Sequence, residues 1–203
     1  MHAATRVVAG VFLAAACATT ALAVDRLTPP PDYGPLPEFA LTDQAGEPVT
    51  RATLQGDVWI ADFVFTRCAG QCPMMAVQMT TLQKRFSDAT DVRLVSFTVD
   101  PAHDTPKVLA AYAHHYGAIA PKWRFLTGDR EAIWKLAREG FKLGVSEEGT
   151  AAEPIVHSIR LVLVDRQAHV RGYYDATDPM AVERLFHDAH RVRSEGREDP
   201  FEE

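Results

Sequence analysis

One stretch of the sequence, an apolar run that leads into a pair of cysteines, limits what this chain can fold into. Residues 58–65 read VWIADFVF, the nearly unbroken apolar pattern expected of a parallel strand that is covered on both faces. The sequence CAGQCP follows at 68–73, and its proline is favoured as the first residue of a helix. A buried strand that passes directly into a helix predicts an α/β sheet, with the cysteines at the carboxyl end of the strand.

The rest of the chain alternates strands and helices in the order that such a sheet needs. Strands are predicted at 92–99 and 123–126, hairpins at 39–50 and 159–174, and helices at 73–86, 105–116, 129–139 and 178–190. This order is typical of an α/β, thioredoxin-like three-layer fold with a mixed central sheet and an N-terminal β-hairpin extension. At 203 residues the chain is long enough for one well-buried core, so we expect a single folded domain.

The first two dozen residues differ from the rest and predict export. Arg6 precedes an apolar run at 7–18, and Ala21-Leu22-Ala23 forms a small-residue cleavage site. Two alternatives to a cleaved signal peptide stay open: an uncleaved membrane anchor, and lipidation at Cys17. In each case the body of the protein lies outside the cytoplasm. We expect a periplasmic protein that is soluble or tethered to the inner membrane by its N-terminal segment.

Composition divides the chain into four expected segments. A signal peptide or membrane anchor at 1–23 is followed by a Pro-rich linker at 24–37, which carries five prolines. The folded domain is expected at 38–190, and a disordered charged tail at 191–203. The formal net charge of −6 excludes nucleic acid as an expected partner.

Three kinds of site compete for the pair Cys68 and Cys72. A disulfide staple is disfavoured, because so short a loop contributes little entropic stabilisation. Two possibilities remain. The cysteines are either a redox pair or two of the three ligands of a metal site, because soft thiolates select Cu(I) or Zn(II) but need a third ligand. With Cys72 expected at the N-cap, the helix dipole favours thiolate, so both sulfurs should be more reactive than an ordinary cysteine.

A histidine is the natural third ligand, and its position in the chain narrows the choice. His157 stands just before the predicted strand at 159–164, in the segment that faces the cysteine loop in a thioredoxin-like sheet. His103 is a rival, because it follows Asp100-Pro101 in a loop at the carboxyl end of the second strand. From the residues alone, either histidine can complete the site.

Three motifs in register resemble the Sco/SenC family. They are FVFTRCAGQCP at 63–73, SFTVDPAHDTP at 96–106, and VHS at 156–158 before an apolar strand. The resemblance covers about residues 37–185. It also has departures: Val156 stands where many members have an aspartate before the ligand histidine, and Ala69 and Gly70 are smaller than usual for the cysteine loop.

The resemblance implies a thioredoxin fold with a C-x-x-x-C-P copper site that a histidine completes. It assigns copper ligation to Cys68, Cys72 and His157, a redox role to the two cysteines, and a supporting role to Asp100 and Asp104. The implied function is a metallochaperone that delivers copper to the binuclear copper site of cytochrome c oxidase, or reduces the cysteines there. The implied cargo is Cu(I), with Cu(II) as a second state. The implied partners are a copper-receiving oxidase subunit or another cuproprotein, and a thiol-disulfide reductant.

Two other functions stay open at this point. One is a metal-independent periplasmic thiol-disulfide reductase, which needs the cysteines but not His157. The other is a binding module that senses copper or redox state. Simpler roles are also expected for several neighbours: core packing for Met74, Met75 and Met79, helix capping for Asp104, loop initiation for Asp100, and either thiolate support or solvent contact for Arg67.

Overall fold

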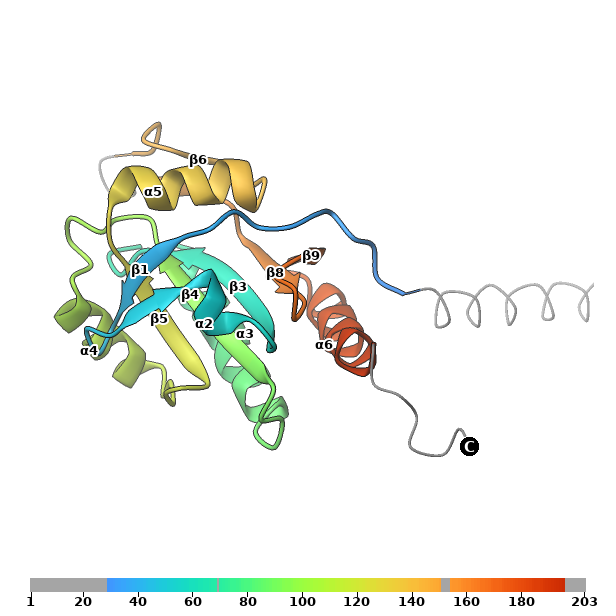
Figure 1. Ribbon diagram of the computed structural model, residues 1–203. Coiled ribbons are helices and arrows are strands. Elements are labelled where there is room, and N and C mark those ends of the chain that lie inside the picture. Colours follow the sequence, from blue (N-terminus) through green and yellow to red (C-terminus); the bar gives the residue numbers. More distant parts are fainter. Residues whose placement is uncertain (1–28, 69, 151–153, 196–203) are drawn as a thin grey trace, which may run out of the picture. The chain divides into compact units, whose positions relative to one another are not determined.

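A mixed seven-stranded sheet forms the centre of the protein (Figure 1). The structure is a computed structural model, and it describes residues 29–68, 70–150 and 154–195. The strand order is β2-β1-β5-β4-β3-β8-β9. The strands are β1 Ala40–Asp43, β2 Pro48–Thr50, β3 Val58–Val64, β4 Val92–Thr98, β5 Trp123–Thr127, β8 Arg160–Val164 and β9 Val170–Asp175.

The parallel part of the sheet comes from the apolar runs of the sequence. β3 pairs in parallel with β4 from Val58–Val92 to Val64–Thr98, and β4 pairs in parallel with β5. Every residue of β3 is buried, which agrees with a strand covered on both faces. β1 joins β5 and β8 joins β3 in antiparallel fashion, so the sheet is mixed.

Helices cover both faces of this sheet. The helices are α2 Arg51–Leu54, α3 Cys72–Arg85, α4 Pro106–His115, α5 Arg130–Lys135 and α6 Pro179–Ser194, and α5 continues into a π-helix, η1, at Leu136–Gly140. On one face, α3, α4 and α6 pack against Val58 and Ile60, while α5 and η1 pack on the other face against Trp59 and Phe63. The predicted three-layer fold, with its mixed sheet and N-terminal hairpin, is confirmed.

The proline-rich segment before β1 belongs in part to the folded domain. Tyr33 N–H donates to the Val170 carbonyl, Val170 N–H donates to the Gly34 carbonyl, and Leu36 N–H donates to the Ala168 carbonyl. Leu36 is only 1% exposed. The predicted start of the fold near Glu38 is therefore wrong: residues 31–37 lie along β9 as an edge strap, because their prolines still leave enough amides and carbonyls to pair.

The last helix also extends further than predicted. It runs to Ser194 and not to about His190, because Val192 is buried and Arg193 forms an ion pair with Asp91. The first residues of the predicted tail thus belong to α6. The predicted leader at 1–23 lies outside the described residues, as do residues 196–203 of the tail. No helix in the described part of the chain is both long and apolar enough to cross a membrane.

A second, very small sheet was not predicted. β6 Val145–Ser146 pairs in antiparallel fashion with β7 Val156–His157, and Val145 lies opposite His157. Ser158 N–H donates to the Gly144 carbonyl at 3.1 Å, which extends the contact by one residue. This ribbon fixes the backbone at His157 just before the chain enters β8.

Candidate metal centre

The cysteine loop connects the carboxyl end of β3 to the start of α3. Gln71 is the N-cap of α3 and contributes no side-chain capping bond, and Cys72 is the first helical residue, with Pro73 in the first turn. The predicted N-cap position of Cys72 is therefore wrong by one residue. Cys72 is fully buried and Cys68 is half-buried, and both are free thiols.

The structure brings His157 to these two cysteines. The ligand atoms of Cys68, Cys72 and His157 all lie within 4.8 Å of one another, and Cys72 Sγ is 3.1 Å from His157 Nε2. On the other side of the ring, His157 Nδ1 is 3.0 Å from the Ser158 carbonyl oxygen. A carbonyl can only accept, so Nδ1 carries a proton, and Nε2 is the ring nitrogen that faces the two sulfurs. Phe65 packs edge-on against the imidazole at 5.7 Å between ring centroids.

The two thiols differ in acidity. Burial alone would raise the pKa of Cys68, but hydrogen bonds from the His157 ring and from Cys72 outweigh it and lower that pKa to about 7. Burial and the hydrogen bond to Cys68 together raise the pKa of Cys72 well above its ordinary value. The prediction that both sulfurs gain thiolate character is wrong for Cys72, because its desolvation exceeds the effect of the helix N-terminus.

Two aspartates from the loop after β4 hold the residues that precede Cys68. Asp104 is completely buried and accepts hydrogen bonds from Thr66 and Thr98, while Asp100 forms an ion pair with Arg67 at 2.5 Å. The helix-capping role predicted for Asp104 is wrong, since the Thr105 side chain caps α4. Arg67 points to Asp100 and not to a thiolate.

The other expected candidates lie elsewhere. His103, His114 and His115 are exposed, and none of them is in the group that could hold an ion. His169 forms an ion pair with Asp32, and His187 forms one with Glu183. The predicted packing role is confirmed for Met75 and Met79, which are fully buried, whereas Met74 is 37% exposed.

One buried residue close to the site gave no signal in the sequence. Asp62 is 0% exposed in the middle of β3, and neither carboxyl oxygen has a hydrogen-bond partner among the described residues. Burial raises the pKa of Asp62 to about 7, against the smaller opposite effects of Ser96 and His157. The hydroxyl of Tyr112 is also buried without a partner in the described chain. Burial raises the pKa of Tyr112, and Cys72 and Asp62 raise it by smaller amounts. A single polar residue inside an apolar run could have been noticed as an exception to the strand pattern.

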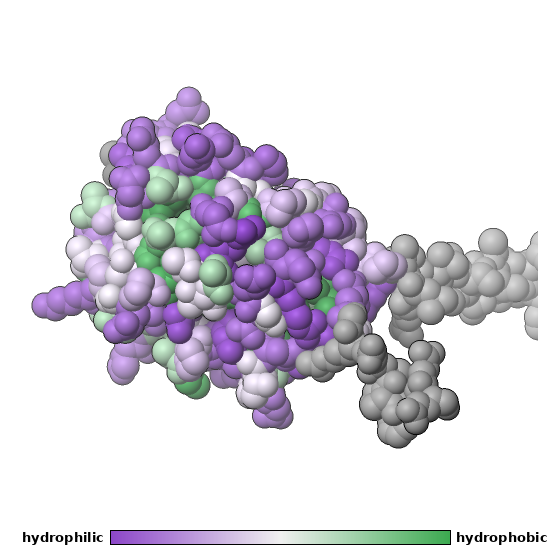
Figure 2. Space-filling model, in the orientation of Figure 1, coloured by the Kyte–Doolittle hydropathy of each residue, from purple (hydrophilic) through white to green (hydrophobic). Residues whose placement is uncertain are grey.

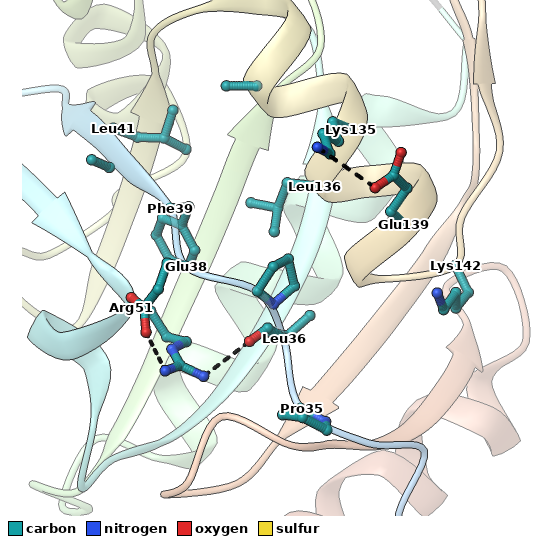
Figure 3. Close-up of a pocket in the computed structure, with 13 residues that line it drawn as sticks. Pro35, Leu36, Glu38, Phe39, Leu41, Arg51, Lys135, Leu136, Glu139 and Lys142 are labelled. Carbon is teal, nitrogen blue, oxygen red and sulfur yellow. Dashed lines mark hydrogen bonds and ion pairs between the residues drawn. The ribbon is translucent and has the colours of Figure 1, made fainter.

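A hollow of about 670 Å³ lies between residues 35–41 and residues 132–142 (Figure 3). Leu36, Phe39, Leu41 and Leu136 form its apolar lining, and the ion pairs Arg51–Glu38 and Lys135–Glu139 lie at its border. Figure 2 shows hydrophobic residues on this face of the molecule, framed by hydrophilic ones. None of the three ligand candidates lines the hollow, so we do not assign it to the metal site.

Comparison with known proteins gives consistent matches. The sequence matches the protein family described as SCO1/SenC over residues 30–192. The SCO1 protein homolog of Bacillus subtilis is 35% identical over 142 residues, which cover 69% of this chain and 73% of that protein.

Solved structures give the same result. A SCO1/SenC family lipoprotein from Bacillus anthracis superposes with a TM-score of 0.75 at 31% identity, covering 82% of this chain and 99% of that one. A second structure, BsSco, has a TM-score of 0.72 at 32% identity and covers 82% of this chain and 97% of its own; it is described as having a disulfide switch and as a member of the Sco family of cytochrome c oxidase assembly proteins. The fold, the order of the motifs and the family match agree, and the chain belongs to the SCO1/SenC family.

Proposed function

We propose that this protein is a copper metallochaperone that binds its cargo through Cys68, Cys72 and His157. The observation that carries the proposal is the meeting of two thiols and one imidazole within 4.8 Å, from segments more than 80 residues apart. Two soft sulfurs and an imidazole suit Cu(I) in a three-coordinate site, and an added ligand lets the same site accept Cu(II). Family membership supports copper over zinc.

The exposure of the ligands fits delivery better than permanent storage. Cys68 and His157 are half-buried, and only Cys72 is fully buried. A partner's thiolates can therefore replace the ligands of this protein one at a time, so copper moves by ligand exchange and is never released as a free ion. Asp100 and Asp104 support this exchange indirectly, by holding the chain before Cys68.

The proposed recipient is a copper-receiving subunit of cytochrome c oxidase, or another cuproprotein. Support comes from the related BsSco, which is described as a cytochrome c oxidase assembly protein. The proposed location is the periplasm, with the N-terminal segment acting as a signal peptide, membrane anchor or lipid attachment site. The description of the Bacillus anthracis relative as a lipoprotein supports a link to a membrane.

Titration of the reduced, metal-free protein with Cu(I), in competition with a chromophoric chelator, tests the proposal. One Cu(I) should bind tightly per chain. His157→Ala should weaken the binding by at least about 10-fold, which is the lower end of what loss of an outer-sphere partner costs a metal site. Circular dichroism should show that His157→Ala keeps its fold. An unchanged affinity in this variant would contradict the assignment.

A second function is favoured by the unequal thiols. A half-buried Cys68 with a pKa near 7 beside a protonated Cys72 is the arrangement of an attacking and a resolving thiol. The protein would then reduce the recipient's disulfide without any metal. Reduction of a model disulfide peptide by the metal-free wild type, at a rate that a Cu(I) chelator does not change, would favour this reductase. His157→Ala should slow that reduction, because the imidazole helps to lower the pKa of Cys68.

A further inference from the structure

The chain that enters the cysteine loop is held at Thr66 by a buried carboxylate. Thr66 N–H donates to Asp104 Oδ2 at 3.0 Å, and the Thr66 hydroxyl donates to Asp104 Oδ1 at 2.5 Å. The hydroxyl of Thr98, at the end of β4, donates to Asp104 Oδ2 at 2.5 Å. Asp104 is 0% exposed, so these three bonds replace the water that its carboxylate has lost. We call Thr66, Thr98 and Asp104 the threonine lock.

The lock joins three separate parts of the fold at one point. Thr66 follows the carboxyl end of β3, Thr98 ends β4, and Asp104 precedes the N-cap of α4. The Asp104 N–H also donates to the Asp100 carbonyl at 2.9 Å, which fixes the backbone of the carboxylate itself. The position of Thr66 is therefore set by the sheet and by the following loop together.

The position of Cys68 depends on that of Thr66, because Cys68 lies only two residues further along the chain. Its own N–H donates to the Phe65 carbonyl at 3.2 Å, so the chain turns back immediately after Thr66. Cys72, by contrast, is placed by the first turn of α3 and by burial. Of the two sulfurs, Cys68 is thus the one whose place depends on the lock.

We propose that Thr66 is a positioning residue of the metal site, and that its hydroxyl, bound by Asp104, holds the Cys68 sulfur within reach of Cys72 and His157. The inference rests on the copper site proposed above and adds a residue that touches no ligand atom. The role is not that of a helix cap, because Thr105 caps α4 independently. Thr98 contributes by fixing the carboxylate from the neighbouring strand.

Cu(I) affinity of the reduced full chain, measured against a chromophoric chelator, tests the lock with paired variants. Thr66→Val keeps the shape of the side chain but removes the hydroxyl, and we expect about a 10-fold loss of affinity, while Asp104→Asn should lose 10- to 100-fold. Thr66→Ser restores the hydroxyl and should restore the wild-type affinity. Rescue by serine separates a positioning role from general damage to the fold.

A matched control comes from a second buried aspartate. Asp165 is 7% exposed and accepts bonds from Gln167 N–H and His169 N–H, next to Val164, which pairs with the start of β3. It therefore lies at the opposite end of the strand from the cysteine loop. Asp165→Asn should lower stability against urea but leave Cu(I) affinity unchanged.

The outcomes separate the lock from the proposed function. If His157→Ala binds Cu(I) weakly and folded Thr66→Val binds it as tightly as the wild type does, the lock is overturned and the copper site stands. If Asp165→Asn loses as much affinity as Asp104→Asn, the effect is general destabilisation and the lock is also overturned. If the wild type binds no Cu(I), both proposals fail together.

Discussion

The two sides of the proposed metal site are built very differently. The cysteines lie where β3, an inner strand of the seven-stranded sheet, passes into α3, and Cys72 is buried in one hydrophobic cluster against which Cys68 packs. His157 lies on a ribbon of two residues per strand, and Val156 beside it is 52% exposed. We call the sheet and α3, which hold the two cysteines, the platform. We call the ribbon of β6 and β7, which holds His157, the arm.

If the proposed copper site is correct, the two thiols should retain the ion and the imidazole should release it. Sulfurs held by the sheet and by α3 should keep their spacing when a partner approaches. An imidazole on a short ribbon needs to break only a few backbone bonds to move, since local stability is lowest where few buried contacts hold a segment. We therefore expect substitutions on the platform to affect the whole fold, and substitutions on the arm to affect the site alone.

The largest expected effect is on the platform core. Phe97 is fully buried on β4, stacks on Phe63 at 5.2 Å, and also contacts the ring of Phe141. Phe97→Ala should lower the free energy of unfolding by about 3–5 kcal/mol, measured by urea denaturation. His157→Ala, on the half-buried arm, should change it by less than about 1 kcal/mol. Equal losses in these two variants would break the contrast between platform and arm.

A pH effect of similar size should come from Asp62 in the middle of β3. The carboxyl group faces Ser96 of β4, and Tyr112 of α4, Cys72 of α3 and His157 of β7 lie within its electrostatic reach. Its folded-state pKa, about 7, lies above the ordinary value of 3.8, so the folded protein holds the proton more tightly than the unfolded chain does. The resulting stabilisation is complete below pH 3.8 and is lost as the pH rises through 7.

The size of this effect follows from the shift in pKa. Raising the pKa of Asp62 from 3.8 to about 7 corresponds to roughly 4 kcal/mol at most. Urea denaturation between pH 4 and 9 should therefore show wild-type stability falling relative to Asp62→Asn, which cannot titrate. If the free energies of unfolding of the two proteins changed with pH in parallel, the Asp62 carboxyl would make no pH-dependent contribution to stability.

A smaller effect separates the two thiols of the platform. At pH 7 about half of Cys68 is thiolate, against a few per cent of an ordinary cysteine, and Cys72 holds its proton. Iodoacetamide should therefore modify Cys68 at least about 10-fold faster than Cys72, with a rate that rises through a midpoint near pH 7. Peptide mapping by mass spectrometry identifies the modified residue. Faster modification of Cys72 than of Cys68 in the folded protein would contradict this prediction. The unfolded protein is the control, and in it the two cysteines should react at equal rates.

The smallest effect is expected on the arm. Val156→Asp introduces the residue that many family members carry before the histidine. Because Val156 is half exposed, the substitution should change the free energy of unfolding by no more than about 0.5 kcal/mol, as measured in urea. A loss several times larger would mean that the arm is anchored as firmly as the platform.

Much of the platform could be predicted because its residues follow long, simple patterns. The apolar run of β3 and the proline after Cys72 indicate a buried strand that passes into a helix, and the element order indicates the layers. The approach of His157 to the cysteines follows from topology, since β8 pairs with β3 and His157 stands just before β8. The choice of His157 over His103 also depended on the family motifs.

The other features of the site could not be predicted, because they produce no repeating pattern in the sequence. Strands of two residues, as in β6 and β7, are too short to show alternation. The bond from Thr66 to Asp104 joins residues 38 positions apart and replaces a local capping interaction that looked equally reasonable. The acidity of Cys68 and Cys72 depends on their burial and on hydrogen bonds with His157 and with each other, which residue identity does not reveal.

The strap at residues 31–37 has a practical consequence for anyone who shortens the chain. Without it, the outer edge of β9 would lose its backbone partners at Ala168 and Val170, and the hydrophobic surface under Leu36 would face water. Open strand edges of this kind invite pairing between molecules. A fragment that begins at Glu38, although it contains every proposed ligand, should therefore aggregate, and one that begins before Pro31 should stay monodisperse.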